Sequence, residues 1–185
     1  MPVFVSMLRA VNVGGHSIIQ METLRELYSA LKFENPQTYL QSGNVIFKAS
    51  ERNPKLIAKR IQQAIEKKFV CRTEIILRTT PELRAVFAGN PFARRRDVPP
   101  NKLLVCFLSA NPGPEARENL RKQKFQPEEL HAADRELYIY FPDGAGKSKL
   151  PWPRIDKILQ TRGTCRNWNS VTKMLELAGK LEASR

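Results

Sequence analysis

Hydrophobic and polar residues alternate with two different periods along the chain, and these periods predict an order of strands and helices. Four short apolar or alternating runs predict strands in the first half: Val3–Arg9, Thr38–Gln41, Val45–Lys48 and Thr73–Arg78. Apolar residues three and four positions apart predict two helices between them: Met21–Lys32 and Pro54–Phe69. The first half therefore has the order strand, helix, strand, strand, helix, strand.

The second half of the chain repeats this order. Its four predicted strands are Leu103–Leu108, Leu130–Ala133, Glu136–Phe141 and Thr164–Trp168. Its two predicted helices are Glu115–Lys124 and Trp152–Gln160. Outside the repeat we expect a helix over Pro81–Ala88, a proline-rich linker over Asn90–Pro100 and a last helix over Ser170–Leu181.

This doubled order is that of the ferredoxin-like unit. We therefore predict an α+β protein with two ferredoxin-like βαββαβ units in tandem, a linker helix and a C-terminal helix. The expected boundaries are residues 1–80 for the first unit, 81–101 for the linker, and 102–185 for the second unit with the C-terminal helix. Right-handed crossovers then put the first and third strands of each unit in the middle of its sheet.

The first strand of each half is apolar on both faces, which predicts that both faces are buried. The two helices would cover one face, and the other half, the extra helices or a second chain would cover the other. Tyr138 and Tyr140 share a face of a neighbouring strand, as stacking aromatics do in ferredoxin-like RNA-binding domains. Because the RNA-binding sequence pattern is missing, we favour core packing for these two tyrosines.

Polar residues of the first half meet at one predicted edge, where the first strand ends, the second and third strands turn and the fourth strand begins. They are Arg9, Asn12, Gly14, Gly15, His16, Gln41, Ser42, Gly43 and Asn44. The glycines would let a ligand approach backbone amides, and the polar side chains would supply neutral donors and acceptors. The same residue types are typical of ordinary turns, so both interpretations stay open.

The opposite edge of the second half collects the ends of its third and fourth strands. Its polar and aromatic residues are Asp143, Lys147, Ser148, Lys149, Arg166, Asn167, Trp168, Asn169 and Lys173. The triplet Gly146–Ser148 is similar to the end of a phosphate-binding loop, but Phe141 stands where the full pattern needs glycine, which excludes a nucleotide hydrolase. Cations and amides at this edge are still expected to hold a phosphate or carboxylate. Helix capping by Asn169 and core packing by Trp168 are the structural alternatives.

Composition adds a net charge of +13, from 31 Lys and Arg against 18 Asp and Glu, which favours a polyanionic partner. The dense basic run Arg94–Arg96 is equally typical of a solvated loop. Three distant cysteines predict free thiols in the cytoplasm, with Cys106 buried and inert. The sequence shows no signal peptide, no membrane helix, no metal-ligand spacing and no catalytic nucleophile with its base.

Four ordered motifs at these positions resemble those of the family called domain of unknown function 1697. They are Leu8–Gly15, Gln41–Val45, Tyr140–Gly144 with Ser148–Leu150, and Thr164–Asn169 with Lys173. Ala10 departs from the family, which usually has glycine there, and Cys165 is a milder variation. The resemblance implies a bacterial-type, soluble protein with two ferredoxin-like parts and no established reaction. Because its motifs coincide with the two polar edges, it supports a functional role for those edges.

We therefore favour an anion-binding protein whose ligand is a phosphorylated small molecule or a nucleic-acid backbone, with no metal or other cofactor. Charge would come from Arg9, Lys147, Lys149, Arg166 and Lys173, and orientation from Asn12, Gln41, Ser42, Asn44, Asn167 and Asn169. One alternative is an enzyme that clamps a small anionic substrate with Arg9 and Arg166. Another is a scaffold that self-associates through a sheet face. The expected state is a cytoplasmic monomer or homodimer with no membrane contact.

Overall fold

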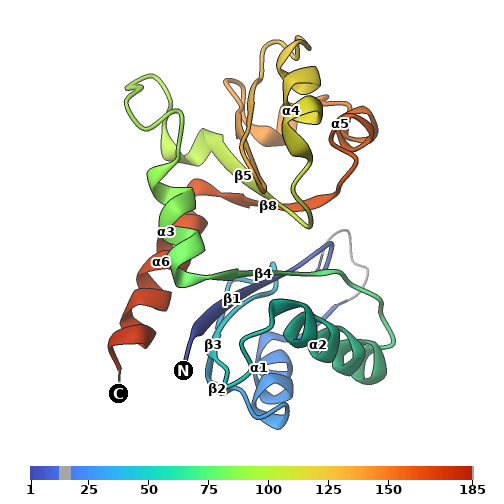
Figure 1. The fold of residues 1–185 in the computed structure, drawn as a ribbon, viewed down its shortest axis with the longest axis vertical. Helices are drawn as coiled ribbons and strands as arrows, with labels where there is room; N and C mark the ends of the chain where they lie inside the picture. Colours follow the sequence, from blue (N-terminus) through green and yellow to red (C-terminus); the bar gives the residue numbers. More distant parts are fainter. Residues whose placement is uncertain (13–17, 185) are drawn as a thin grey trace. The chain divides into compact units, whose positions relative to one another are not determined.

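The computed structural model describes residues 1–12 and 18–184, and the chain forms two compact units (Figure 1). Unit 1 comprises Met1–Ala85 with Lys173–Arg185, and unit 2 comprises Val86–Thr172. Each unit contains one four-stranded antiparallel sheet. The predicted mixed α+β class with two tandem βαββαβ repeats is therefore confirmed.

Unit 1 contains the first repeat. Its elements are β1 (Val3–Leu8), α1 (Met21–Ala30), β2 (Glu34–Tyr39), β3 (Asn44–Lys48), α2 (Pro54–Phe69) and β4 (Ile75–Thr79). The strand order is β2-β3-β1-β4, so the first and third strands lie in the middle, as right-handed crossovers require. Asn53 begins α2 by accepting a hydrogen bond from the Lys55 amide, and Pro54 follows at the first helical position.

Unit 2 contains the second repeat in the same arrangement. Its elements are β5 (Leu103–Leu108), α4 (Gly113–Arg121), β6 (Glu129–Ala132), β7 (Glu136–Tyr140), α5 (Trp152–Leu159) and β8 (Gly163–Asn167). The strand order is β6-β7-β5-β8. Two short 3-10 turns, η1 (Pro100–Lys102) and η2 (Ala145–Lys147), precede β5 and follow β7.

Two further helices lie outside the repeats: α3 (Thr80–Ala88) and α6 (Trp168–Ala183). The division between the units falls inside both helices, after Ala85 and after Thr172. The boundaries at residues 80/81 and 101/102 stay a prediction about domains. None of the helices in the described parts of the chain has the length and apolar character needed to cross a bilayer.

The edge strand β2 shows the largest difference from the sequence prediction. We expected it to begin at Thr38, and it begins at Glu34. Its ladder with β3 shifts register between Glu34 and Gln37, and Asn35 has a left-handed φ of 49°. Pro36 is tolerated because an edge strand has one side without ladder hydrogen bonds. This irregularity removes the alternation by which a strand is detected in sequence.

The helices of each unit cover one face of its sheet (Figure 1). In unit 1 this core has an aromatic centre, where Phe47 lies 4.6 Å from Phe33, 5.2 Å from Tyr28 and 6.0 Å from Phe4 between ring centroids. In unit 2 the corresponding core is mainly aliphatic, with Leu137, Ile139 and Leu159 among its buried residues. Residues on the second face of β1 and β5, such as Val5 and Val105, are also buried within this one chain.

Tyr138 and Tyr140 pack in the core, as favoured above. The Tyr138 hydroxyl donates to the Val86 carbonyl at 2.8 Å, and the Tyr140 hydroxyl donates to the Asp97 carbonyl at 3.1 Å. The Phe92 ring lies 6.2 Å from the Tyr140 ring. The end of α3 and the segment between α3 and β5 therefore cover these two tyrosines, on the face of the second sheet that an RNA-binding domain leaves open.

Arg95, the middle residue of the basic run, belongs to this covering segment. Its guanidinium lies 5.5 Å from the centre of the Tyr140 ring and forms ion pairs with Asp97 and Glu129. The hydrogen bonds from Arg95 lower the pKa of the Asp97 carboxyl. This arginine therefore fastens the segment to the sheet, while Arg94 and Arg96 are exposed.

The prediction of three free thiols is wrong for two of the cysteines. Cys106 on β5 lies opposite Cys165 on β8, and the two form a disulfide. Their separation of 59 residues hid this pair, because only the register of β5 with β8 brings them together. Cys71 is free, and burial raises the pKa of its thiol.

Candidate functional site

At the polar edge of unit 1, Asn12 links two loops. Its side-chain amide donates to the carbonyls of Ile19 at 3.0 Å and Gln41 at 2.7 Å, and its side-chain oxygen accepts from the Ile19 amide at 2.7 Å. The backbone of Asn12 has a left-handed φ of 55°, which asparagine tolerates better than most residues. Much of its hydrogen-bonding capacity therefore holds the connection after β1 to the turn before β3.

The turn between β2 and β3 has equally specific packing. Gly43 has φ +73°, and an added Cβ would lie 2.8 Å from Val11 Cγ2 and 2.9 Å from Leu8 Cβ. Asn44 is fully buried and donates to the Tyr39 carbonyl and to Ser42 Oγ, both at 2.9 Å. These contacts explain why the turn needs glycine, serine and asparagine at these positions.

The structure describes only some of the remaining predicted residues of this edge. Arg9 is half-buried, and its backbone carbonyl accepts a 2.7 Å hydrogen bond from Thr73. Gly14, Gly15 and His16 lie outside the described residues. The structural interpretation thus accounts for Asn12, Ser42, Gly43 and Asn44, and ligand binding at this edge stays a prediction.

In unit 2 the end of β8 is also occupied by internal contacts. Arg166 is only 7% exposed, and its guanidinium donates to Thr164 Oγ1 at 2.8 Å and to the Cys165 carbonyl at 2.9 Å. Burial lowers the pKa of Arg166 to about 10, so this side chain remains cationic at neutral pH. Little of it is accessible to a ligand from solution.

The residues after Arg166 support the start of α6. The Asn167 side chain accepts from the Asn169 amide at 3.0 Å and donates to the Asn101 carbonyl at 3.1 Å. Trp168 stacks on Phe87, with ring centroids 5.3 Å apart and planes inclined by 18°. The capping asparagine is therefore Asn167 rather than Asn169. Further along α6, Lys173 forms a 2.8 Å ion pair with Glu176.

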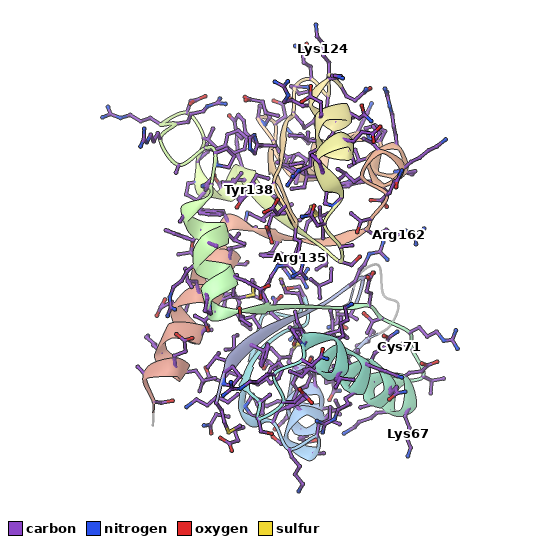
Figure 2. The ribbon with its side chains drawn as sticks, viewed as in Figure 1. Lys67, Cys71, Lys124, Arg135, Tyr138 and Arg162 are labelled. Carbon is purple, nitrogen blue, oxygen red and sulfur yellow. A yellow bond between two sulfur atoms is a disulfide. The ribbon has the colours of Figure 1, made fainter. Side chains whose placement is uncertain are left out.

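The other half of the predicted edge of unit 2 forms a pocket of about 510 Å³. Asp143, Lys147, Ser148 and Lys149 line it from the connection between β7 and α5. Residues that the sequence analysis did not select complete the lining: Lys124, Phe125, Gln126, Pro127, Glu128, Leu150, Pro151 and Arg154. Figure 2 shows Lys124 beyond the end of α4, with its side chain extended away from the ribbon. The volume is within the range of about 300–1,000 Å³ that is typical of small-molecule sites.

Charges of both signs line this pocket without neutralising one another. The lining contains four cationic side chains, Lys124, Lys147, Lys149 and Arg154, and two acidic ones, Glu128 and Asp143, which leaves a net charge of +2. Within the described residues, neither carboxylate has a lysine or arginine nitrogen within 4.0 Å. Elsewhere in unit 2, Arg95, Arg117 and Arg121 all have acidic partners. The pocket therefore gathers charges that are not paired with one another in one concave place.

One of the two acids is held in place by the pocket wall. The Ser148 hydroxyl donates to Glu128 Oε1, and Ser148 Oγ accepts from the Leu150 amide at 3.2 Å. Arg154 donates to the side-chain oxygen of Gln123. These bonds position Glu128 and Arg154 before any ligand arrives.

Several backbone amides around this pocket form hydrogen bonds within their own segments. The amides of Gly144, Lys147 and Ser148 donate to the carbonyls of Phe141, Gly144 and Ala145 inside the loop. At the start of α5, the amides of Trp152, Arg154 and Ile155 are also engaged, and Pro153 has none. The amides of Lys147 and Ser148, which a phosphate loop would direct at its ligand, are therefore engaged within the loop.

Strand order explains why the pocket has this composition. The end of β7 lies beside the start of β6, whereas β5 separates β7 from β8. The connection before β6 therefore contributes Lys124 and Glu128, and none of Arg166, Asn167, Trp168, Asn169 and Lys173 appears in the described lining. The sequence signal that was missed is the long polar connection between α4 and β6. The described residues contain no group of three or more His, Cys, Asp and Glu side chains suited to a metal.

Comparison with known proteins identifies the family. The family model "Protein of unknown function (DUF1697)" matches residues 1–138, so the chain belongs to this family. Its structure is similar to that of the conserved bacterial protein SP0830 from Streptococcus pneumoniae, with a TM-score of 0.72 and 17% sequence identity. The match covers 96% of this chain and 98% of the other, and at this identity it shows a shared fold. No curated protein matches the chain in sequence.

Proposed function

We propose that this member of the DUF1697 family binds a phosphorylated small molecule in the pocket of unit 2. The observation that carries the proposal is the set of four cationic side chains around one concave site, of which Lys124, Lys147 and Lys149 have no ion pair within the described residues. A phosphate monoester has a charge of about −2 at neutral pH, which balances the net charge of the pocket. The proposal assumes a cytoplasmic location, where phosphorylated metabolites are retained.

A small molecule suits this geometry better than a nucleic-acid backbone. A backbone needs cations along an extended path, because it carries regularly spaced phosphates. Here, in the part of the chain that the structure describes, three lysines without ion pairs line one pocket. In the covering segment Arg95 is bonded to Asp97 and Glu129, which leaves Arg94 and Arg96 as the exposed cations of that basic run. Binding of duplex or single-stranded DNA with a steep dependence on salt would favour the nucleic-acid alternative instead.

The test is calorimetric titration of the full chain with inorganic phosphate, ethyl phosphate and ribose 5-phosphate. Lys147→Ala combined with Lys149→Ala is expected to weaken binding by about a hundredfold or more, since each charged hydrogen bond contributes about 1.5–3 kcal/mol. The matched control is Lys55→Ala with Lys59→Ala, which removes the same charge from exposed positions on α2. Equal affinity of the two double variants, or no binding of any of the three probes to the wild type, would overturn the proposal.

A further inference from the structure

The two carboxylates are the unexplained part of the pocket. An anion alone gains nothing from Glu128 and Asp143, because both repel it. Ionised carboxylates accept hydrogen bonds and cannot donate them, so they require a ligand group with a donor. Only one oxygen of Glu128 is engaged, by Ser148, and within the described residues Asp143 has no polar partner. A ligand that fits the whole pocket therefore combines an anion with hydrogen-bond donors.

Hydroxyl groups suit the role of ligand donor better than an ammonium group does. The pocket has a net positive charge, which disfavours a second cation beside Lys124, Lys147 and Lys149. A hydroxyl can donate to a carboxylate and accept from a lysine at the same time. The lining combines lysine donors with a carboxylate acceptor around Ser148. Lys147 and Lys149 are its neighbours in sequence, and Glu128 accepts a hydrogen bond from it.

We infer that the ligand is a phosphorylated polyol or sugar, with its phosphate on the lysines and its hydroxyls on Glu128 and Asp143. This inference rests on the proposed function of the pocket. Ser148 orients Glu128 and thereby fixes where a ligand hydroxyl must lie. The apolar lining residues Phe125, Pro127 and Pro151 offer surface for the carbon skeleton.

The experiment compares two phosphate monoesters, ribose 5-phosphate and ethyl phosphate, on the wild-type protein. Ribose 5-phosphate is expected to bind at least about tenfold more tightly, because one hydrogen bond to a charged group contributes this much. Binding of both compounds with equal affinity would overturn the inference and leave the proposed function standing. Binding of neither would overturn the proposed function itself.

A variant sharpens the assignment to Glu128. Glu128→Ala is expected to remove the preference for ribose 5-phosphate while ethyl phosphate still binds, which also reports that the variant is folded. The matched control is Asp156→Ala, which removes one negative charge from α5 at a position outside the pocket lining. A preference that survives in Glu128→Ala, or that disappears equally in Asp156→Ala, would contradict the role of Glu128. The comparison on the wild type decides the ligand class even if the variant fails to fold.

Discussion

The two units share their strand order and differ in what lies between the strands. In unit 1, α2 has 16 residues and the connection from β3 to it spans only residues 49–53. In unit 2, α5 has 8 residues and the connection from β7 spans residues 141–151. The connections before β2 and β6 differ in the same direction, with residues 31–33 in unit 1 and 122–128 in unit 2. The pocket is built from the two longer connections of unit 2, so connection length rather than strand arrangement distinguishes the repeats.

The hydrophobic cores of the two units also differ in size. Among the residues that the structure describes, the helix-facing core of unit 1 contains 16 buried residues with an aromatic centre, whereas that of unit 2 contains 9. A longer second helix supplies unit 1 with Ile57, Ile61 and Ile65 on one face. Unit 1 therefore has more apolar contact to stabilise it, and unit 2 has more chain in polar loops. This comparison can be tested at equivalent positions.

The largest effect is expected from the two core residues that occupy equivalent places, Phe47 on β3 and Ile139 on β7. Phe47→Ala is expected to lower the free energy of unfolding by about 4 kcal/mol and Ile139→Ala by about 3 kcal/mol, because the phenylalanine is larger and contacts three rings. Denaturant unfolding followed by far-UV circular dichroism measures both. Tryptophan fluorescence adds a probe specific to unit 2, since Trp152 and Trp168 both lie there. A larger loss for Ile139→Ala would break the proposed difference between the cores.

A second, smaller contrast concerns two glycines with positive φ. Gly43→Ala in unit 1 is expected to lower the free energy of unfolding by about 3 kcal/mol. A Cβ there would be opposed both by the left-handed backbone and by close contacts with Val11 and Leu8. Gly144→Ala in unit 2 is expected to lower the free energy of unfolding by only about 1 kcal/mol. Its φ of +87° opposes a side chain, but nothing lies within 4 Å of the added Cβ. Urea unfolding of each variant gives the comparison. An equal loss of unfolding free energy in the two variants would show that backbone strain alone determines both effects.

The smallest effect concerns a feature that the units have in common, a buried tyrosine. Burial raises the pKa of both Tyr28 and Tyr138 above the usual value near 10. Above pH 10 the unfolded chain therefore loses these protons before the folded protein does, and stability falls as pH rises. At pH 11 each tyrosine is expected to account for about 1.4 kcal/mol of the loss relative to pH 8. Tyr28→Phe and Tyr138→Phe should each reduce the loss by this amount in urea unfolding, and an unchanged loss in either variant would contradict its burial.

Most secondary structure was predictable because it depends on local spacing. The bounds of α2 and β5 agree with the sequence prediction at both ends, since each has a clear apolar pattern and a distinct boundary. The start of β2 was not predictable, because Pro36 and the register shift interrupt its alternation. Four of the twelve described lining residues of the pocket were predictable for a similar reason: Asp143 and Lys147–Lys149 lie in one continuous polar loop.

The chain's own periodicity was enough to establish the two repeats, because apolar spacing determines which faces must be removed from water. The general handedness of crossovers then gave the strand order of each sheet. Only the tertiary structure decided which loops became neighbours. It placed Lys124 and Glu128 in one pocket with Ser148, paired Cys106 with Cys165, and buried the guanidinium of Arg166. Such contacts depend on the register and order of strands that lie far apart in sequence, and a local sequence pattern specifies neither.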